Sequence, residues 1–207
     1  MQEEWNNLIK HNDHKINYDG LEIVVHDGVF TPDSNLTHST TQTLEYIKKL
    51  DIKGKEILDI GCGTGIIGIT CLAKGAKKVT FSDINPKAVD NTLENLKANN
   101  FSDKVEVIQS DLFKNINGKF DFVFANLPIS NELWSPEISE ETETLVERFL
   151  SELPSFVNKN GRVIINWGSF ASLEELKNSL EKFKYEYNQI QEKSLGHDWY
   201  IIDIQFK

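Results

Sequence analysis

Glycine occurs at every second position from Gly61 to Gly65, directly after a short apolar run that contains Asp59. Glycine adopts positive φ at little cost and lets a ligand approach the backbone closely. A second apolar stretch follows with helical spacing, and the free N–H groups at the start of a helix favour an anionic or electron-rich group. We therefore predict a strand, a tight turn and a helix N-terminus that together bind a nucleotide-like cofactor.

Two classes of cofactor fit this turn. Read from Gly63, the pattern Gly63-x-Gly65-x-x-Gly68 matches the dinucleotide-binding motif, and Asp83 follows about 20 residues later, where that motif has an acid for the ribose. Read from Asp59, the pattern is Asp-x-Gly-x-Gly-x-Gly, which resembles motif I of the class I S-adenosylmethionine (SAM) methyltransferases. An acid beside the turn would repel the pyrophosphate of a dinucleotide, whereas in that family it helps to bind the ammonium group of SAM. Asp59 therefore favours SAM.

Polar residues also stand at or just past the ends of four predicted strands, at Asp59, Asp83, Asp111 and Asn126. In an open α/β sheet, ligands bind outside the carboxyl ends of the strands, so this recurrence indicates one shared site. The resemblance to class I methyltransferases implies that Asp83 accepts both ribose hydroxyls, which suits a carboxylate, and that Asp111 meets the adenine amino group. Ile84 would pack on the adenine. The residues assigned to the cofactor on this basis are Thr41, Asp59, Gly61, Gly63, Gly65, Asp83, Ile84, Asp111, Leu112 and Asn126.

Residues 124–129 read Phe-Ala-Asn-Leu-Pro-Ile and follow another predicted strand. This stretch resembles the Asn-Pro-Pro-Tyr motif of amino-methyltransferases, which include release-factor glutamine and adenine N6-methyltransferases. In those enzymes the Asn side-chain oxygen and a following backbone carbonyl accept hydrogen bonds from the target NH2 group, and this positioning provides most of the catalysis. The resemblance assigns catalytic roles to Asn126 and Pro128. Leu127 replaces the first Pro of the motif, and Ile129 replaces the aromatic residue that stacks on a planar amide or base.

Residues 37–41 read Thr-His-Ser-Thr-Thr. They resemble the Thr-His-x-Thr-Thr helix start of ribosomal-protein lysine methyltransferases, which place that segment over the cofactor. Those enzymes also carry Asn-Ile/Leu-Leu where this chain has Asn126-Leu127-Pro128, and a late tryptophan comparable to Trp199. Their separate N-terminal substrate-recognition domain has no counterpart in this sequence, where only residues 1–50 precede the expected catalytic core.

A polar loop is expected at residues 129–139, after the strand that ends near Asn126. Its position makes it a candidate substrate lid in which Trp134 covers a planar or cationic group, although this tryptophan would equally serve to pack the loop down. We assign Phe30, Leu127 and Trp134 to the acceptor side of the site. The acidic stretch at residues 137–147 is typical of a solvated helix face. The 5 histidines show no metal-ligand spacing, and we expect no metal.

The remaining pattern predicts strands that alternate with helices. Val89, Leu93 and Leu96 mark the buried face of a helix whose first turn contains Pro86. A second helix is expected to start with an N-cap at Thr37 or Ser39. The expected strands lie at residues 21–25, 57–60, 79–83, 105–109, 120–125, 162–167, 185–190 and 199–206, and the expected helices at 2–12, 37–50, 66–74, 86–96, 140–153 and 173–183.

Alternating strands and helices imply a parallel sheet with right-handed crossovers, and two consecutive strands at the end imply an antiparallel hairpin. We predict an α/β fold that resembles the Rossmann-like class I methyltransferase fold: a seven-stranded, mostly parallel sheet with a C-terminal antiparallel hairpin and helices on both faces. Residues 1–207 are expected to form one domain. Within it, residues 1–50 are an N-terminal extension that covers the cofactor, and residues 51–207 are the catalytic core.

Composition limits the partners. The net charge is −10, and binding to nucleic acid depends largely on Lys and Arg contacts to phosphates, so a nucleic-acid partner is disfavoured. No apolar run approaches the ~18 residues of a membrane span, and the first residues lack the regions of a signal peptide. We therefore expect a cytoplasmic protein without a membrane partner. Cys62 and Cys71 do not make a disulfide framework and are expected to be reduced packing residues.

Together these observations predict a SAM-dependent methyltransferase that methylates nitrogen on a protein, peptide or small-molecule amine or amide. Two alternatives stay open at this point. The spacing from Gly63 to Gly68, with Asp83, also suits an NAD(P)-dependent oxidoreductase, although the chain has no obvious Tyr-x-x-x-Lys or His-centred group for hydride transfer. Because Asn126-Leu127-Pro128 departs from the known motif, a non-catalytic SAM-binding protein is the other alternative.

Overall fold

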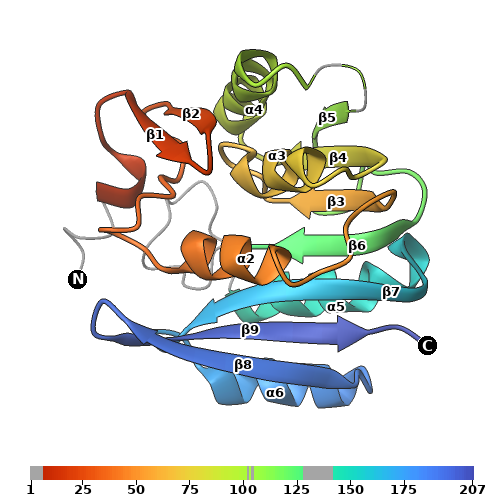
Figure 1. Cartoon of the computed structure of the whole chain (residues 1–207). Helices are drawn as coiled ribbons and strands as arrows, with labels where there is room; N and C mark the ends of the chain where they lie inside the picture. The colour runs from red at the N-terminus through yellow and green to blue at the C-terminus, as the bar shows by residue number, and fades with distance from the viewer. Residues whose placement is uncertain (1–6, 102, 104, 128–141) are drawn as a thin grey trace.

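The computed structural model of the chain describes residues 7–101, 103, 105–127 and 142–207, and Figure 1 shows how their helices and strands are arranged. The elements are β1 (His14–Tyr18), β2 (Leu21–Val25), α2 (Ser39–Ile47), β3 (Glu56–Ile60), α3 (Ile66–Ala73), β4 (Lys78–Asp83), α4 (Pro86–Ala98), β5 (Val105–Gln109), β6 (Phe120–Ala125), α5 (Thr142–Phe156), β7 (Val157–Gly168), α6 (Leu173–Lys182), β8 (Tyr187–Ser194) and β9 (His197–Gln205).

A seven-stranded sheet forms the centre of the molecule, with the strand order β5-β4-β3-β6-β7-β9-β8. The pairs from β5 to β7 are parallel, whereas β9 is antiparallel to both β7 and β8. The β8–β9 hairpin turns through Leu195 and Gly196, which both have positive φ, at 53° and 77°. Such a two-residue turn matches the twist of the flanking strands. The predicted fold class and its C-terminal hairpin are confirmed.

Apolar residues on the two faces of this sheet belong to two separate cores. In β6, Phe122 and Phe124 pack into one core with α2, α3 and β2, whereas Val123 and Ala125 pack into the other with α5 and α6. Successive side chains of a strand point to opposite faces, so a central strand covered on both sides reads as continuously apolar. In Figure 1, α2 lies in front of the sheet, and α5 and α6 lie behind it.

The helix α4 buries Leu96 as predicted but not Leu93, because asparagines form much of its buried face. Leu93 is 49% exposed, whereas Asn91 and Asn95 are fully buried. The carboxamides of Asn91, Asn95 and Asn99 accept hydrogen bonds from the backbone N–H groups of β2 and its next residue, His26, and donate to carbonyls of β2. These three asparagines, at every fourth position, form a row of hydrogen bonds that we call the α4 ladder. The ladder turns the asparagines toward β2 and leaves Leu93 on the exposed side of the helix.

The N-terminal part of the described chain differs from the prediction in three places. Strand β1, which pairs antiparallel with β2, was not predicted because its sequence His-Lys-Ile-Asn-Tyr carries little apolar signal. Of the helix expected at residues 2–12, residues 7–9 are helical, residues 10–12 are not, and residues 2–6 lie outside the described part. The predicted N-cap of α2 was wrong, because His38 occupies that position and makes no capping hydrogen bond through its side chain.

Cys62 and Cys71 are both free and buried, as expected. The described part of the chain contains no helix with the length and apolar character of a membrane span.

Candidate active site

The glycine turn between β3 and α3 has the backbone that its sequence predicts. Gly61, Gly63 and Gly65 all have positive φ, at 70°, 55° and 78°. A Cβ atom on Gly65 would lie 2.9 Å from the side chain of Thr92, so the turn packs directly against α4. A Cβ atom on Gly63 would meet only Val29, at 4.0 Å. The backbone at Gly63 is therefore the part of the turn that a ligand can approach.

Asp83 ties the end of β4 to the glycine turn. Its two carboxylate oxygens accept the backbone N–H groups of Gly63 and Asn85, each at 2.9 Å. Each carboxylate oxygen has a second lone pair, so both remain able to accept the hydroxyls of a ribose. Burial raises the pKa of Asp83. The next residue, Ile84, is 50% exposed and presents apolar surface beside this carboxylate, as packing on an adenine requires.

Asp59 lies beneath the turn rather than at its surface. It is 1% exposed, and its carboxylate accepts the N–H of Gly68 in the first turn of α3 at 2.9 Å. Burial raises its pKa to about 7, and the nearby Asp83 adds to this increase while the Gly68 bond opposes it. Asp59 thus holds α3 against β3. Its direct contact to the ammonium group of SAM stays a prediction.

Asp111 and Leu112 form a tight turn after β5. Leu112 is buried with a positive φ of 44°, and its carbonyl accepts the Ser110 hydroxyl at 2.8 Å. One carboxylate oxygen of Asp111 accepts Nη2 of Arg148 from α5 at 2.9 Å. Arg148 was not predicted as part of the site, because nothing in the sequence indicates that a helix 37 residues later returns to this turn.

Asn126 follows β6 and faces the first turn of α2. Its Nδ2 atom donates to Ser39 Oγ at 3.3 Å and to Thr40 Oγ1 at 3.4 Å. With Nδ2 placed toward these two hydroxyls, Oδ1 is the carboxamide atom that remains for a ligand. The side chain of Leu127 packs against the glycine turn, because a Cβ atom added to Gly61 would lie only 2.9 Å from Cδ2 of Leu127. Two predicted site residues, Pro128 and Trp134, and the candidate lid at residues 129–139 lie outside the described residues.

The N-terminal segment passes beside the glycine turn after β2. The carbonyl of Gly28 accepts Asn85 Nδ2 at 3.0 Å, and Val29 is the nearest side chain to the open side of Gly63. Phe30 and Thr41, both predicted site residues, are half-buried in this loop and in the first turn of α2. The structure therefore brings the segment before residue 50 next to the predicted cofactor site.

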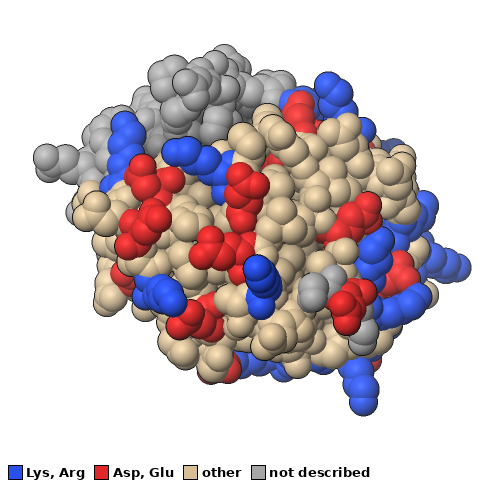
Figure 2. All heavy atoms as spheres, turned by 90° about the horizontal axis from the view of Figure 1, so that it is seen from above, with Lys and Arg blue, Asp and Glu red and all other residues tan. Residues whose placement is uncertain are grey.

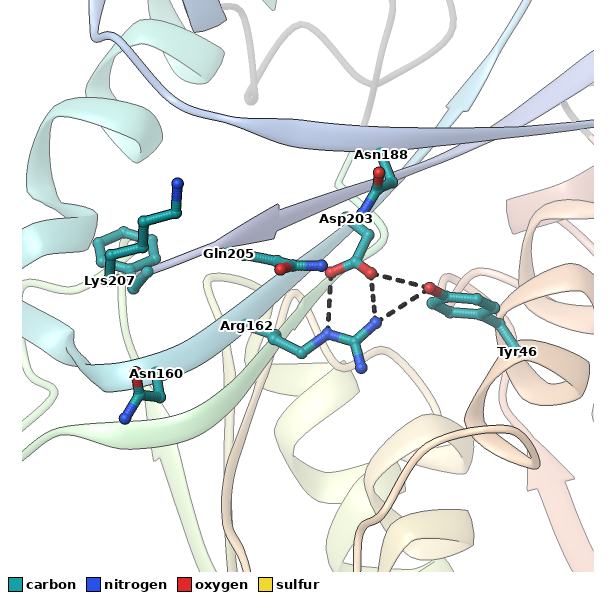
Figure 3. Close-up of a pocket in the computed structure, with 8 residues that line it drawn as sticks. Tyr46, Asn160, Arg162, Asn188, Asp203, Gln205 and Lys207 are labelled. Carbon is teal, nitrogen blue, oxygen red and sulfur yellow. Dashed lines mark hydrogen bonds and ion pairs between the residues drawn. The ribbon is translucent and has the colours of Figure 1, made fainter.

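A second cavity lies at the opposite ends of β7 and β9 and has a volume of about 420 Å³ (Figure 3). In it, the guanidinium of Arg162 donates to both carboxylate oxygens of Asp203 and to the hydroxyl of Tyr46 from α2. Tyr46 in turn donates to Asp203 at 2.8 Å, and Asp203 is 1% exposed. These three groups satisfy one another, so we assign them to the attachment of α2 rather than to the reaction.

The family is recognised from most of the chain. Residues 20–195 match the family described as the methyltransferase small domain. This chain belongs to that family. It is a SAM-dependent methyltransferase with the class I Rossmann-like fold, and the oxidoreductase alternative from the sequence was wrong.

Two relatives and one solved structure illustrate the similarity. A Methanocaldococcus jannaschii protein named as a protein N5-glutamine methyltransferase is 34% identical over 182 residues, which cover 83% of this chain and 88% of the relative. The ribosomal protein L11 methyltransferase of Thermosipho africanus is 37% identical over 130 residues, but only 44% of its length is covered. The structure of the Thermus thermophilus 16S rRNA N2 G1207 methyltransferase, bound to AdoMet and guanosine, has a TM-score of 0.72 at 18% identity and covers 95% of this chain and 50% of that chain.

These comparisons and the geometry agree on the cofactor. The open backbone at Gly63, the two acceptor oxygens of Asp83 and the exposed side chain of Ile84 lie at or next to the carboxyl ends of β3 and β4. Their assignment to the amino-acid end, the ribose and the adenine of SAM, in that order, stays a prediction.

Proposed function

We propose that this methyltransferase transfers the methyl group of SAM to a side-chain nitrogen of a protein, and that the carboxamide of glutamine is the acceptor. The observation that carries the proposal is the orientation of Asn126, whose Nδ2 is taken by the hydroxyls of Ser39 and Thr40. Its Oδ1 is then directed to accept an N–H from the acceptor. The relative that matches along 88% of its own length and is named for protein glutamine methylation supports the choice of glutamine.

The chain's own residues act by positioning. SAM supplies an electrophilic methyl group. A primary carboxamide has two N–H donors; Asn126 Oδ1 accepts one of them, and the resemblance to amino-methyltransferases implies a following backbone carbonyl as the acceptor of the second. With both hydrogens held, the nitrogen faces the cofactor side of the sheet, where the glycine turn and Asp83 lie. Alignment of this kind accounts for most of the expected acceleration, and the proton leaves after the nitrogen has been alkylated.

We also propose that nucleic acid is not the acceptor. Figure 2 shows the face seen from above in Figure 1, where Lys and Arg alternate with Asp and Glu instead of forming a basic patch. Several lysines of the described chain are paired, for example Lys78 with Glu106 at 2.8 Å. Phosphate recognition depends on cations gathered on one surface, and the described residues seen in Figure 2 form no such patch. The RNA-methylating neighbour shares the fold at 18% identity, which carries no information about the acceptor.

The acceptor is tested with SAM labelled in its methyl group. Peptide pools with glutamine, lysine or neither, together with total tRNA and rRNA, are incubated with the enzyme and the label. We expect label in the glutamine pool, and we expect a peptide with glutamine replaced by glutamate to lose it. Label confined to lysine peptides would replace glutamine by lysine as the acceptor, and label confined to RNA would overturn the proposal.

The role of Asn126 is tested by Asn126→Ala. The substitution removes the accepting oxygen, and we expect kcat to fall by about 100-fold or more, because positioning is lost at the transition state. The Kd for SAM should change by less than about threefold, since the cofactor residues on β3 and β4 are untouched. Isothermal titration gives the Kd and the labelled-methyl assay gives kcat. Unchanged turnover would remove Asn126 from the mechanism.

A further inference from the structure

Two asparagines lie side by side at the carboxyl ends of β6 and β7. Ala125 pairs with Ile165 in the register of these strands, and Asn126 and Asn166 are the next residues on each. Both donate from Nδ2 to Ser39 at the start of α2: Asn126 to its hydroxyl at 3.3 Å, and Asn166 to its carbonyl at 3.1 Å. One residue of α2 thus connects the two carboxamides.

The directions of the Asn166 and Gln42 side-chain amides are determined by their neighbours. A backbone carbonyl can only accept, so Asn166 must present Nδ2 to Ser39, and Gln42 must present Nε2 to the carbonyl of Trp199, at 3.3 Å. The remaining hydrogen of Asn166 Nδ2 then reaches Gln42 Oε1 at 3.2 Å. Gln42 and Asn166 are both 2% exposed, so water does not compete for these bonds.

The buried carboxamide of Asn166 lowers the stability of the folded protein. Its Oδ1 is buried and has no hydrogen-bond partner among the residues that the structure describes, and an unsatisfied buried oxygen costs roughly 1–3 kcal/mol. An apolar side chain of similar size would avoid that cost. The presence of the amide is therefore explained by its NH2 end, which fixes the carbonyl of Ser39 and with it the first turn of α2.

We propose that Asn166, together with Gln42, is a positioning residue for Asn126 and acts through the first turn of α2. Trp199, Gln42, Asn166 and Ser39 form a chain of hydrogen bonds that runs from β9 to α2, and the hydroxyls of Ser39 and Thr40 complete it by holding Asn126 Nδ2. This chain leaves Asn126 with its oxygen toward the acceptor. The inference rests on the proposed function of Asn126, and Asn166 itself touches neither substrate nor cofactor.

The test replaces Asn166 by leucine, which has similar volume and no amide. The side-chain NH2 signals of Asn126 are followed by 15N NMR in protein saturated with S-adenosylhomocysteine. We expect these signals to shift and their hydrogens to exchange about tenfold faster or more, because the hydroxyls that hold them are no longer fixed. The dispersion of the remaining spectrum reports whether the variant is folded. Unchanged Asn126 signals in a folded variant would overturn the proposal.

A second pair of variants covers the case in which Asn166→Leu does not fold. Thr40→Val removes one of the two hydroxyls without changing the shape of the side chain, and Thr40→Ser keeps it. We expect Thr40→Val to alter the Asn126 signals and Thr40→Ser to restore them. Equal spectra for the two variants would contradict the hydrogen-bond chain.

Kinetics with the labelled glutamine peptides separate this inference from the proposed function. If Asn166 acts only through Asn126, Asn166→Leu lowers kcat about tenfold or more in the wild-type enzyme and has no further effect in the Asn126→Ala background. The Kd for SAM stays within about twofold. Independent, multiplying effects would overturn the role of Asn166 alone. A normal kcat for Asn126→Ala would instead overturn the proposed function.

Discussion

At the scale of single residues, the buried carboxyl of Asp59 lowers the stability of the folded protein at neutral pH. The folded protein keeps a proton on this carboxyl up to a pH of about 7, whereas the unfolded chain loses it near the ordinary pKa of 3.8. Between these values the unfolded chain binds fewer protons, so the free energy of unfolding falls as the pH rises from about 4 to about 7. Asp83, whose pKa burial also raises, contributes with the same sign.

Replacing Asp59 by asparagine should therefore stabilise the protein without ligand. The amide oxygen still accepts the N–H of Gly68, but no charge has to be buried, and we expect a gain of roughly 1–4 kcal/mol at pH 8 that disappears below pH 4. Urea denaturation at both pH values measures it. If Asp59 also attracts the ammonium group, the affinity for SAM falls about tenfold. Unchanged affinity would limit Asp59 to holding α3.

The glycine turn allows a matched comparison of two substitutions. Gly65 and Gly118 both have positive φ, but a Cβ atom on Gly118 meets nothing within 4 Å, whereas on Gly65 it would press on Thr92. Thr92 is held in place by its bond to the carbonyl of Gly63 at 3.0 Å. We expect Gly118→Ala to cost about 1–2 kcal/mol from backbone strain and Gly65→Ala to cost about 1–3 kcal/mol more. Thermal unfolding measures both, and equal losses would contradict the packing argument.

Sequence reasoning found the residues whose roles are encoded locally. The glycine turn, Asp83 and Asn126 belong to short motifs, so their positions followed from spacing. Asn166 carries no such signal, because its partner Ser39 is 127 residues away in the chain and only the sheet register brings them together. A polar residue within a predicted strand, close to its carboxyl end, is the one feature that would have marked it.

At the scale of elements, α2 is attached to the sheet at both of its ends. Its first turn is held by Asn166, and its last turn by Tyr46, which reaches Asp203 and Arg162 in the second cavity (Figure 3). These attachments lie on β7 and β9, so α2 is held against the sheet at its first and its last turn.

The attachment at Tyr46 leads to a stability prediction. Asp203→Ala leaves the guanidinium of Arg162 without its partner in a mostly buried position, and we expect a loss of roughly 3–5 kcal/mol. Tyr46→Phe removes only the hydroxyl and should cost about 1 kcal/mol. Replacing Asp203 and Arg162 together by leucine and methionine should restore most of the loss. Denaturant titration distinguishes these values, and a double variant as unstable as Asp203→Ala would contradict the charge argument.

The elements themselves were predictable where apolar periodicity decides them. Strands β3 to β6 and helices α3 and α6 follow their apolar pattern closely, whereas β8 lies at Tyr187–Ser194 instead of 185–190 and β7 begins at Val157 instead of residue 162. The buried face of α4 does not, because there Leu93 is exposed and buried asparagines bond to a backbone edge. Hydrophobic periodicity cannot detect a helix face whose partners are main-chain N–H and C=O groups.

At the scale of the whole molecule, the proposed roles divide the sheet into a cofactor half and an acceptor half. Strands β5, β4 and β3 carry the glycine turn and the acids, and β7, β9 and β8 carry the supports of α2. The N-terminal segment crosses the cofactor half, where Val29 approaches Gly63. The family and fold followed from the order of strands and helices, whereas the acceptor depends on contacts between distant elements.

Hydrogen exchange can test this division directly. Saturation with S-adenosylhomocysteine should slow exchange in residues 26–31 and 61–68, because the ligand lies between the N-terminal segment and the glycine turn. Strand β8, at the far edge of the acceptor half, should exchange at its original rate and serves as the internal control. Slower exchange in β8 without slower exchange in residues 26–31 would indicate that the ligand binds in the acceptor half, and it would contradict the proposed division.

The α4 ladder has a consequence for protein engineering. Asn91, Asn95 and Asn99 bond to main-chain atoms of β2 and His26, and every residue type except proline offers the same pair of groups there. The bonds of this ladder therefore place no demand on the side chains of β2. Val24 and Glu22, whose partner is the exposed Lys15, can be replaced as long as Ile23 and Val25 fill the core and His26 keeps its contact to Glu94, so the hairpin can accept a foreign epitope.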